Sequence, residues 1–166
     1  MGLLTLREEE KLARDVYLYA YDKYGQGPFG NISNSEQRHM DAILQLLNKF
    51  GLPDPASPDR GVFNNQTLQD LYNTLTAQVD LSYVDALRVG ATIEDLDIKD
   101  IKEFEANTDK TNILDTFGRL KCGSRNHMRA YYSALQTEGV TYTAQYIPQA
   151  ELDDIVNSPN EQCGRN

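Results

Sequence analysis

Cysteine, histidine and long hydrophobic runs are scarce in this sequence. Its 166 residues include two cysteines and two histidines. A zinc or iron–sulfur site built from cysteine alone takes four thiolates, so sites of that kind are excluded. No apolar run approaches the roughly 20 residues that a membrane-spanning helix requires. We therefore expect a soluble protein that is not inserted in a membrane.

Positive charge is also scarce. Lysine and arginine total 16 against 25 aspartates and glutamates, and the formal net charge is −9. Nucleic acids and anionic lipid surfaces are bound through clustered cationic side chains, so this balance argues against both partners. Hydrophobic residues (40%) and charged residues (25%) are near the averages of globular proteins. This length and composition predict a single domain over residues 1–166.

The two cysteines, Cys122 and Cys163, leave two interpretations open. A disulfide between them would close a loop of about 40 residues and contribute roughly 4 kcal/mol in the chain-entropy model. It would also favour an exported protein, periplasmic or extracellular, because disulfides persist in oxidising compartments. Two free thiols would fit a cytoplasmic protein equally well.

Helical periodicity dominates the chain, and no β-hairpin signal is present. Apolar residues recur at spacings of three and four over four long segments, which predicts an all-α fold. Glycine follows three of these segments, as is typical of helix C-termini. The predicted long helices are Thr5–Tyr24, Ile32–Phe50, Tyr83–Asn107 and Asn112–Glu138. Their N-caps are predicted at Thr5, which forms a capping-box pattern with Glu8, at Asn31 and at Ser82.

The connections between these helices differ in length. The short loop Gly25–Gly30 predicts that the first two helices are antiparallel neighbours. A crossover from Leu52 to Leu81 separates the second and third helices and carries a short helical pattern of its own. A C-terminal arm, about residues 140–166, contains a further short helix near Ala150–Asn157. The predicted architecture is a four-helix bundle of about residues 5–139 with one long crossover, plus this arm.

Polar residues interrupt the predicted core face of each long helix near its middle. Elsewhere these faces, read at spacings of three and four, are mainly apolar. The interruptions are Glu10 in the first helix, Glu36 and His39 in the second, Glu94 and Asp97 in the third, and Ser124 and His127 in the fourth. Within each of the last three helices the two residues are one turn apart, so both can reach the same point.

A metal centre explains this arrangement. Each unpaired carboxylate in a dry core would oppose folding by several kcal/mol. Four carboxylates would neutralise two divalent cations, and two neutral imidazoles would complete the ligand set. Such oxygen and nitrogen donors suit iron or manganese, and zinc is a further candidate. We predict a centre, preferably of two iron ions, with the ligands Glu10, Glu36, His39, Glu94, Asp97 and His127.

Three alternatives stay open at this point. If the phase of the first helix is wrong by one residue, Glu9 replaces Glu10 as the ligand. The polar residues could instead form a hydrogen-bonded network without metal. Tyr17, two turns after Glu10, could donate a hydrogen bond to a ligand or act in redox chemistry, or it could simply pack in the core.

One segment resembles a known family. Residues 10–17 read E-x-x-A-R-x-x-Y and are similar to the first metal-binding helix of rubrerythrin-type ferritin-like proteins. From Leu6 to Ile155 the chain resembles a prokaryotic ferritin-like family of unknown function, on the runs Val89–Ile98 and Gly123–His127. The resemblance implies a di-iron-type bundle and a peroxide- or dioxygen-dependent oxidoreductase or ferroxidase. It also implies a homodimer.

The fourth helix departs from the rubrerythrin pattern. Where that pattern has Glu-x-x-His, this chain has Ser124-Arg125-Asn126-His127. Asp97, one turn after Glu94, resembles the second acid of a Glu-x-x-Glu motif and could supply the missing carboxylate. One metal position would then be weaker or more open, and a centre with a single metal ion is an alternative.

Two functions are therefore predicted as alternatives. The first is a metal-dependent oxidoreductase that takes electrons from an external electron donor protein, because a rubredoxin-type Cys-x-x-Cys is missing. The second is a non-catalytic metal-binding or partner-binding bundle of the cell exterior, in which metal only stabilises the core.

Overall fold

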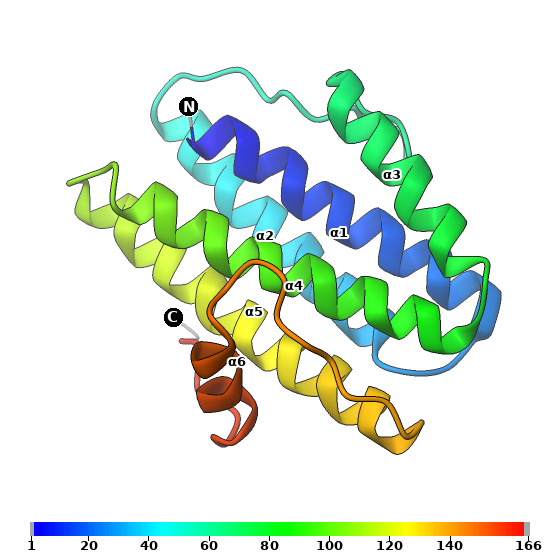
Figure 1. The fold of residues 1–166 in the computed structure, drawn as a ribbon. Coiled ribbons are helices and arrows are strands. Elements are labelled where there is room, and N and C mark those ends of the chain that lie inside the picture. The colour runs from blue at the N-terminus through cyan, green and yellow to red at the C-terminus, as the bar shows by residue number, and fades with distance from the viewer. Residues whose placement is uncertain (1, 165–166) are drawn as a thin grey trace. The chain divides into compact units, whose positions relative to one another are not determined.

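All regular structure in residues 2–164, which the structure describes, is helical (Figure 1). This computed structural model has six helices and no strand within that range. They are α1 (Gly2–Tyr24), α2 (Phe29–Lys49), α3 (Gln66–Val79), α4 (Tyr83–Glu105), α5 (Thr111–Thr137) and α6 (Gln149–Val156). The predicted all-α class, the four long helices and the two short ones are therefore confirmed. None of the described helices combines the length and hydropathy of a membrane span.

The chain divides into two compact units. The first covers residues up to Ala86 and the second begins at Leu87, so that α4 starts in the first unit and continues in the second. The prediction of one domain over residues 1–166 is not tested by this division and stays a prediction.

The glycine stop signals are correct, whereas two of the predicted N-caps are wrong. Gly25, Gly51 and Gly139 follow α1, α2 and α5 with φ of 59°, 66° and 75°, a region that glycine enters without strain. Thr5 lies inside α1 and cannot cap it. Asn31 lies inside α2, which begins after Pro28, because the proline ring already sets φ at −78°, near the helical value.

The third predicted N-cap, Ser82, is correct. Its hydroxyl accepts a hydrogen bond from the Asp85 backbone N–H at 3.0 Å and donates to the Asp85 carboxylate at 2.6 Å. α4 therefore begins with an acid in its first turn, where a negative charge is favourable.

In the first unit α1 and α2 form an antiparallel pair (Figure 1). Arg14 in α1 donates a hydrogen bond to Gln37 in α2. Glu10 lies four residues before Arg14, and its carboxylate contacts His39, which lies two residues after Gln37. The two helices therefore run in opposite directions. α3 contacts α1, and the Tyr24 hydroxyl donates to the Val79 carbonyl at 2.7 Å.

A buried ion pair fixes the crossover segment to α1. Lys11 Nζ donates to the Asp15 carboxylate at 2.6 Å, and both side chains are at most 1% exposed. Lys11 Nζ also donates to the backbone carbonyls of Asp59 (2.9 Å) and Val62 (3.1 Å). Asp15 in turn accepts the Gly61 N–H at 2.9 Å. One lysine and one aspartate therefore pair the polar backbone of the segment that precedes α3.

In the second unit α4 and α5 are antiparallel. Near one end of the pair the rings of Phe104 and Phe117 lie 6.4 Å apart. Near the other end Tyr131 packs directly on Gly90, where a Cβ would lie 2.4 Å from the tyrosine ring. Because glycine has no side chain, this position allows the ring to lie close to the α4 backbone.

The C-terminal arm is attached to this helix pair at several places, of which two hold its start and its end. The buried Asp95 carboxylate accepts hydrogen bonds from the Tyr142 hydroxyl (2.7 Å) and from the backbone N–H groups of Gln145 (2.6 Å) and Ile147 (2.8 Å). Further along, Cys163 forms a disulfide with Cys122 in α5. Of the two interpretations of the cysteines, the structure has the disulfide. The last two residues of the predicted arm, 165 and 166, lie outside the described residues.

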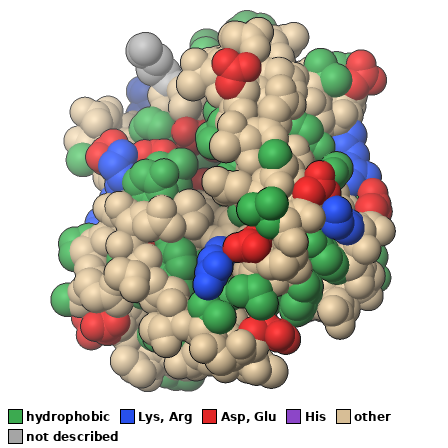
Figure 2. Space-filling model, turned by 45° about the vertical axis from the view of Figure 1, so that its right-hand side comes forward, with side chains coloured by type: hydrophobic (Ala, Val, Ile, Leu, Met, Phe, Trp, Pro, Cys, Tyr) green, Lys and Arg blue, Asp and Glu red, His purple; other side chains and the backbone are tan. Residues whose placement is uncertain are grey.

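Some charged side chains of opposite sign lie close together at the surface. Figure 2 shows acidic and basic groups as close neighbours on the displayed face. Pairs of this kind include Lys23–Asp80 at 2.6 Å and Lys102–Glu151 at 2.6 Å. Such exposed pairs contribute little to stability, typically below about 1 kcal/mol each.

The attachment of the arm is expected to weaken in acid. Hydrogen bonds from Arg125, aided by Arg129, lower the pKa of Glu161 from 4.5 to about 2. A carboxylate with a lowered pKa stabilises the folded state above its unfolded value, and this contribution is lost as the pH falls from about 4.5 to 2. The protection factors of the amides in residues 158–163, which compare each exchange rate with that of an unfolded peptide at the same pH, should therefore fall over this range, and the Glu161→Gln variant should lack this fall.

Candidate metal centre

Glu10, Glu36 and His39 form a buried cluster in the first unit. His39 Nδ1 lies 2.8 Å from Glu36 Oε2 and 3.1 Å from Glu10 Oε2. The two glutamates are 0% exposed and the histidine 9%. Glu36 and His39 are one turn apart on α2, and the antiparallel pairing with α1 brings Glu10 to the same point. One donor atom from each residue lies within 4.8 Å of the other two.

Burial prevents this cluster from carrying two negatively charged glutamates and a neutral histidine at neutral pH. Burial raises the pKa of Glu10 to about 8, because the positive His39 only partly compensates and Glu36 adds repulsion. For His39, burial favours the neutral ring, but the two neighbouring carboxylates outweigh it and raise the pKa well above 6.5. Without a metal ion, the folded protein therefore retains protons on this cluster near neutral pH.

The donor set fits a divalent cation. The Oε1 atom of Glu10 is buried and has no hydrogen-bond partner within the part of the chain that the structure describes. Two carboxylates and one imidazole within this spacing match the oxygen and nitrogen ligands of iron, manganese or zinc. A cation bound here would displace the protons held by Glu10 and His39, and the Oε1 atom of Glu10 could coordinate it.

A second cluster lies on the helix pair of the second unit. His127 Nδ1 in α5 is 3.4 Å from Glu94 Oε2 in α4, and both residues are buried. Asp97, one turn after Glu94, is only 4% exposed. Ser124 is 1% exposed, and its hydroxyl donates to the Leu120 carbonyl of its own helix at 3.2 Å.

The two clusters follow the same plan. In each antiparallel pair the first helix supplies a glutamate, Glu10 or Glu94, and the second supplies a histidine, His39 or His127. They differ three residues before the histidine, where the first unit has Glu36 and the second has Ser124. The structure therefore groups Glu10, Glu36 and His39 in one unit and Glu94 with His127 in the other, and metal coordination by these residues and by Asp97 stays a prediction.

The sequence left open the roles of two further residues of α1, Tyr17 and Glu9. Tyr17 is completely buried in α1, and its role as a hydrogen-bond donor to a ligand, in redox chemistry or in core packing stays a prediction. Glu10 contacts His39, so α1 has the predicted phase, and Glu10 rather than Glu9 is the candidate ligand.

Replacing Gly90 by alanine is expected to disturb the second cluster. The new Cβ would lie 2.4 Å from the Tyr131 ring, one turn from the Glu94–His127 contact on both helices. Overpacking of this kind costs about 1–3 kcal/mol, and thermal unfolding should show the loss. Gly118→Ala is the matched control, because within the described residues that Cβ has no neighbour inside 4 Å. The control should gain about 1 kcal/mol from helix propensity, and a similar gain at Gly90 would contradict the prediction.

Several buried polar groups were not predicted as structural residues. Lys11 and Asp15 are four residues apart in α1. A lysine and an acid at this spacing can form an ion pair on a helix, so the spacing was a signal from which the pair could have been predicted. Asp95 had no such signal, because its partners lie about 50 residues away in the arm.

The fold and the two clusters define an all-helical protein with buried carboxylate–imidazole groups. Residues 1–159 match the model of a family described as an uncharacterized protein domain, DUF2202. The chain belongs to this family. An uncharacterized protein of Methanocaldococcus jannaschii is 49% identical over 162 residues, which are 97% of this chain and 88% of that protein.

A solved structure is similar over nearly the whole chain. It is a crystal structure of a hypothetical protein from Methanococcus jannaschii, with a TM-score of 0.95 at 49% sequence identity. The match covers 96% of this chain and 92% of the other. The comparisons give a family without an assigned function, so the ferritin-like and rubrerythrin-type assignment stays a prediction.

Proposed function

We propose that this protein is a ferritin-like metal-binding protein. In this proposal α1, α2, α4 and α5 pack as one four-helix bundle, with α3 in the long crossover and an arm at the C-terminus. Carboxylates and histidines from the four helices then serve one centre for two iron ions, with manganese or zinc as alternatives. The antiparallel helix pair within each unit, with its buried Glu–His contact, supports the proposal.

One observation carries the metal proposal. The His39 imidazole lies between two carboxylates that are 0% exposed, and one oxygen of Glu10 has no partner in residues 2–164. Buried polar atoms are almost always paired, because leaving one unpaired costs about 1–3 kcal/mol. A bound cation would supply the missing partner.

The residues have distinct proposed roles. Glu10, Glu36 and His39 would hold metal in the first unit, and Glu94, Asp97 and His127 in the second. Bound iron would supply redox chemistry towards peroxide or dioxygen. Leu6 and Ala13 lie one turn from Glu10 on α1, and Ile43 lies one turn from His39 on α2. All three side chains are fully buried, so they would help to keep bulk water from the first cluster.

We infer from this chemistry a peroxide- or dioxygen-dependent oxidoreductase or a ferroxidase. Its electrons would come from an external donor protein, because both cysteines of the chain form the disulfide. The proposal includes a homodimer, which rests on the rubrerythrin resemblance, and an exported location, which the disulfide favours.

Iron loading tests this function. Protein loaded with ferrous ion without oxygen and freed of excess metal should retain about two iron ions per chain by elemental analysis. It should then consume hydrogen peroxide. The double variant Glu36→Gln, His39→Ala should lose iron, whereas Asp41→Asn, which changes an exposed carboxylate on the same helix, should not. Failure of the wild-type protein to retain iron, manganese or zinc would contradict the metal proposal.

A non-catalytic metal-binding protein is the second candidate, and Ser124 favours it. This position lacks the carboxylate of the rubrerythrin pattern, and its hydroxyl is bonded to the helix backbone. If iron-loaded protein leaves peroxide and dioxygen unchanged while chelation lowers its melting temperature, this second function is supported and the oxidoreductase is contradicted.

A further inference from the structure

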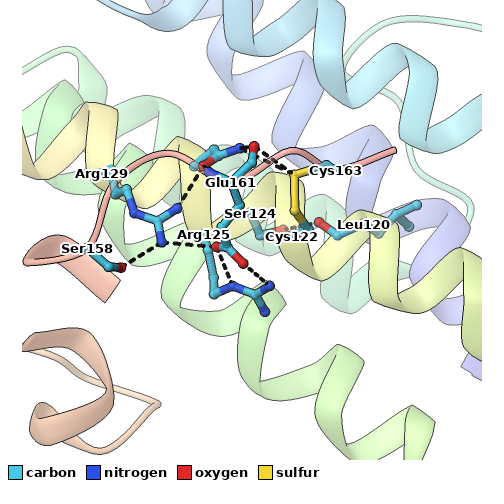
Figure 3. Close-up of a disulfide and its surroundings, with 9 residues drawn as sticks. Leu120, Cys122, Ser124, Arg125, Arg129, Ser158, Glu161 and Cys163 are labelled. Atoms are coloured by element: carbon cyan, nitrogen blue, oxygen red, sulfur yellow. Dashed lines mark hydrogen bonds and ion pairs between the residues drawn. A yellow bond between two sulfur atoms is a disulfide. The ribbon is translucent and has the colours of Figure 1, made fainter. Parts of the chain in front are cut away.

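The end of the C-terminal arm lies along one face of α5. Residues 158–163, here the latch segment, contact α5 only through side chains of residues 122–129 among the interactions described (Figure 3). These two turns also carry Ser124 and His127. The segment therefore contacts the part of α5 that supplies the proposed ligand.

Glu161 makes most of the polar contacts of the latch segment. Its carboxylate accepts two hydrogen bonds from Arg125, at 2.6 and 2.7 Å, and one from Arg129 at 3.0 Å. Its backbone N–H donates to Asn126 Oδ1 at 2.9 Å, and its carbonyl accepts from Asn126 Nδ2 at 3.0 Å. Figure 3 shows the carboxylate of Glu161 directed at the two arginines. Paired, charge-assisted hydrogen bonds of this kind have a defined geometry.

The disulfide adds a covalent link to the same face. Cys122, Arg125, Asn126 and Arg129 follow one another at spacings of three, one and three residues, so they share one side of the helix. At about 100° per residue, His127 and Ser124 lie on the opposite side. Cys122 is buried, whereas Cys163 is partly exposed, so a reductant can reach the bond from the Cys163 side.

We propose that the Cys122–Cys163 disulfide makes the latch segment a redox-sensitive clamp that holds α5 in the position required for metal binding. The clamp rests on the proposed metal function. A dithiol reductant attacks Sγ of Cys163, the sulfur–sulfur bond breaks, and Cys122 leaves as a thiolate that takes up a proton. The second thiol of the reductant then displaces Cys163. The protein disulfide becomes two thiols as the dithiol becomes a disulfide.

Reduction of the disulfide releases only the end of the arm, the latch segment. Residues 142–147 stay bound to Asp95, and the Ile155 carbonyl still accepts from Arg129 at 2.8 Å. The ion pairs of Glu161 and the hydrogen bonds to Asn126 and Ser158 then hold the segment without a covalent link, in competition with water, so the segment opens more often. The two turns of α5 lose a fixed support on the side opposite His127, and the metal affinity falls.

Cys163→Ser tests the clamp without a chemical reductant. Hydrogen exchange, followed by mass spectrometry, should be about tenfold faster over residues 158–163 in this variant than in the oxidised wild-type protein. Titration with Mn²⁺ alone should give a Kd about tenfold higher. Wild-type protein reduced with a phosphine should behave like the variant, and Ser158→Ala, which removes one contact to Arg129, should behave like the oxidised protein.

The outcomes separate the clamp from the metal function. Faster exchange together with an unchanged Mn²⁺ affinity would overturn the coupling between the disulfide and metal binding. Unchanged exchange would overturn the clamp itself. Absence of Mn²⁺, Fe²⁺ and Zn²⁺ binding in the oxidised wild-type protein would contradict the proposed function and, with it, the coupling.

Discussion

Replacing Asp15 by asparagine is expected to cost about 3–5 kcal/mol in the free energy of unfolding. Lys11 Nζ donates to this carboxylate and to two backbone carbonyls, and its side chain is 1% exposed. The variant leaves the ammonium group buried without a counter-charge. It also weakens the bond that the Gly61 N–H donates to Asp15, so the crossover segment loses part of its attachment to α1. Urea denaturation monitored by circular dichroism measures the loss.

Asp22→Asn is the matched control for this prediction. Asp22 also belongs to α1 and pairs with Arg60 of the same crossover segment at 2.9 Å, but its side chain is 65% exposed. Exposed pairs contribute below about 1 kcal/mol, so this variant should unfold close to the wild-type midpoint. Similar losses of stability in the two variants would show that burial does not determine how much the Lys11–Asp15 pair contributes to the free energy of unfolding.

The helices were predictable because each long segment carries its own periodic pattern. α2, α4 and α5 depend on apolar residues at spacings of three and four and on glycine or serine signals at their ends, which are local properties of the chain. The N-caps Thr5 and Asn31 were wrong for a related reason. Threonine and asparagine also occur within helices, and the local pattern does not distinguish these positions.

The first candidate cluster was predictable for the same local reason. Glu36 and His39 share a face of one helix, and the short Gly25–Gly30 loop requires α1 and α2 to be antiparallel, so Glu10 could be placed opposite them. The partners of Asp95 were not predictable, because its hydrogen-bond donors lie in residues 142–147 of the arm, whose path the helical pattern does not specify. The disulfide was left open because a separation of 41 residues allows both bonded and free cysteines.

Metal-free protein is expected to lose stability as the pH rises from about 4.5 to 8. The pKa of Glu10 is raised from 4.5 to about 8 and that of His39 is raised well above 6.5, so the folded state binds more protons than the unfolded state. Stabilisation by a group with a raised pKa is complete below its unfolded value and is lost as the pH passes through its folded value. The expected loss is about 2–4 kcal/mol, since a tenfold change in acidity corresponds to about 1.4 kcal/mol. Urea denaturation of chelator-treated protein at several pH values measures it.

Metal should reverse this dependence, because a cation competes with the protons held by Glu10 and His39. Stabilisation by added Mn²⁺ is therefore expected to increase over the same pH range in which the metal-free protein weakens. Glu10→Gln removes the main titrating group, so the metal-free variant should show a much flatter pH profile, and it should also bind Mn²⁺ more weakly. Asp41→Asn should keep the wild-type profile. A Glu10→Gln variant with a flat profile and unchanged Mn²⁺ affinity would show that this buried carboxylate titrates but does not coordinate metal.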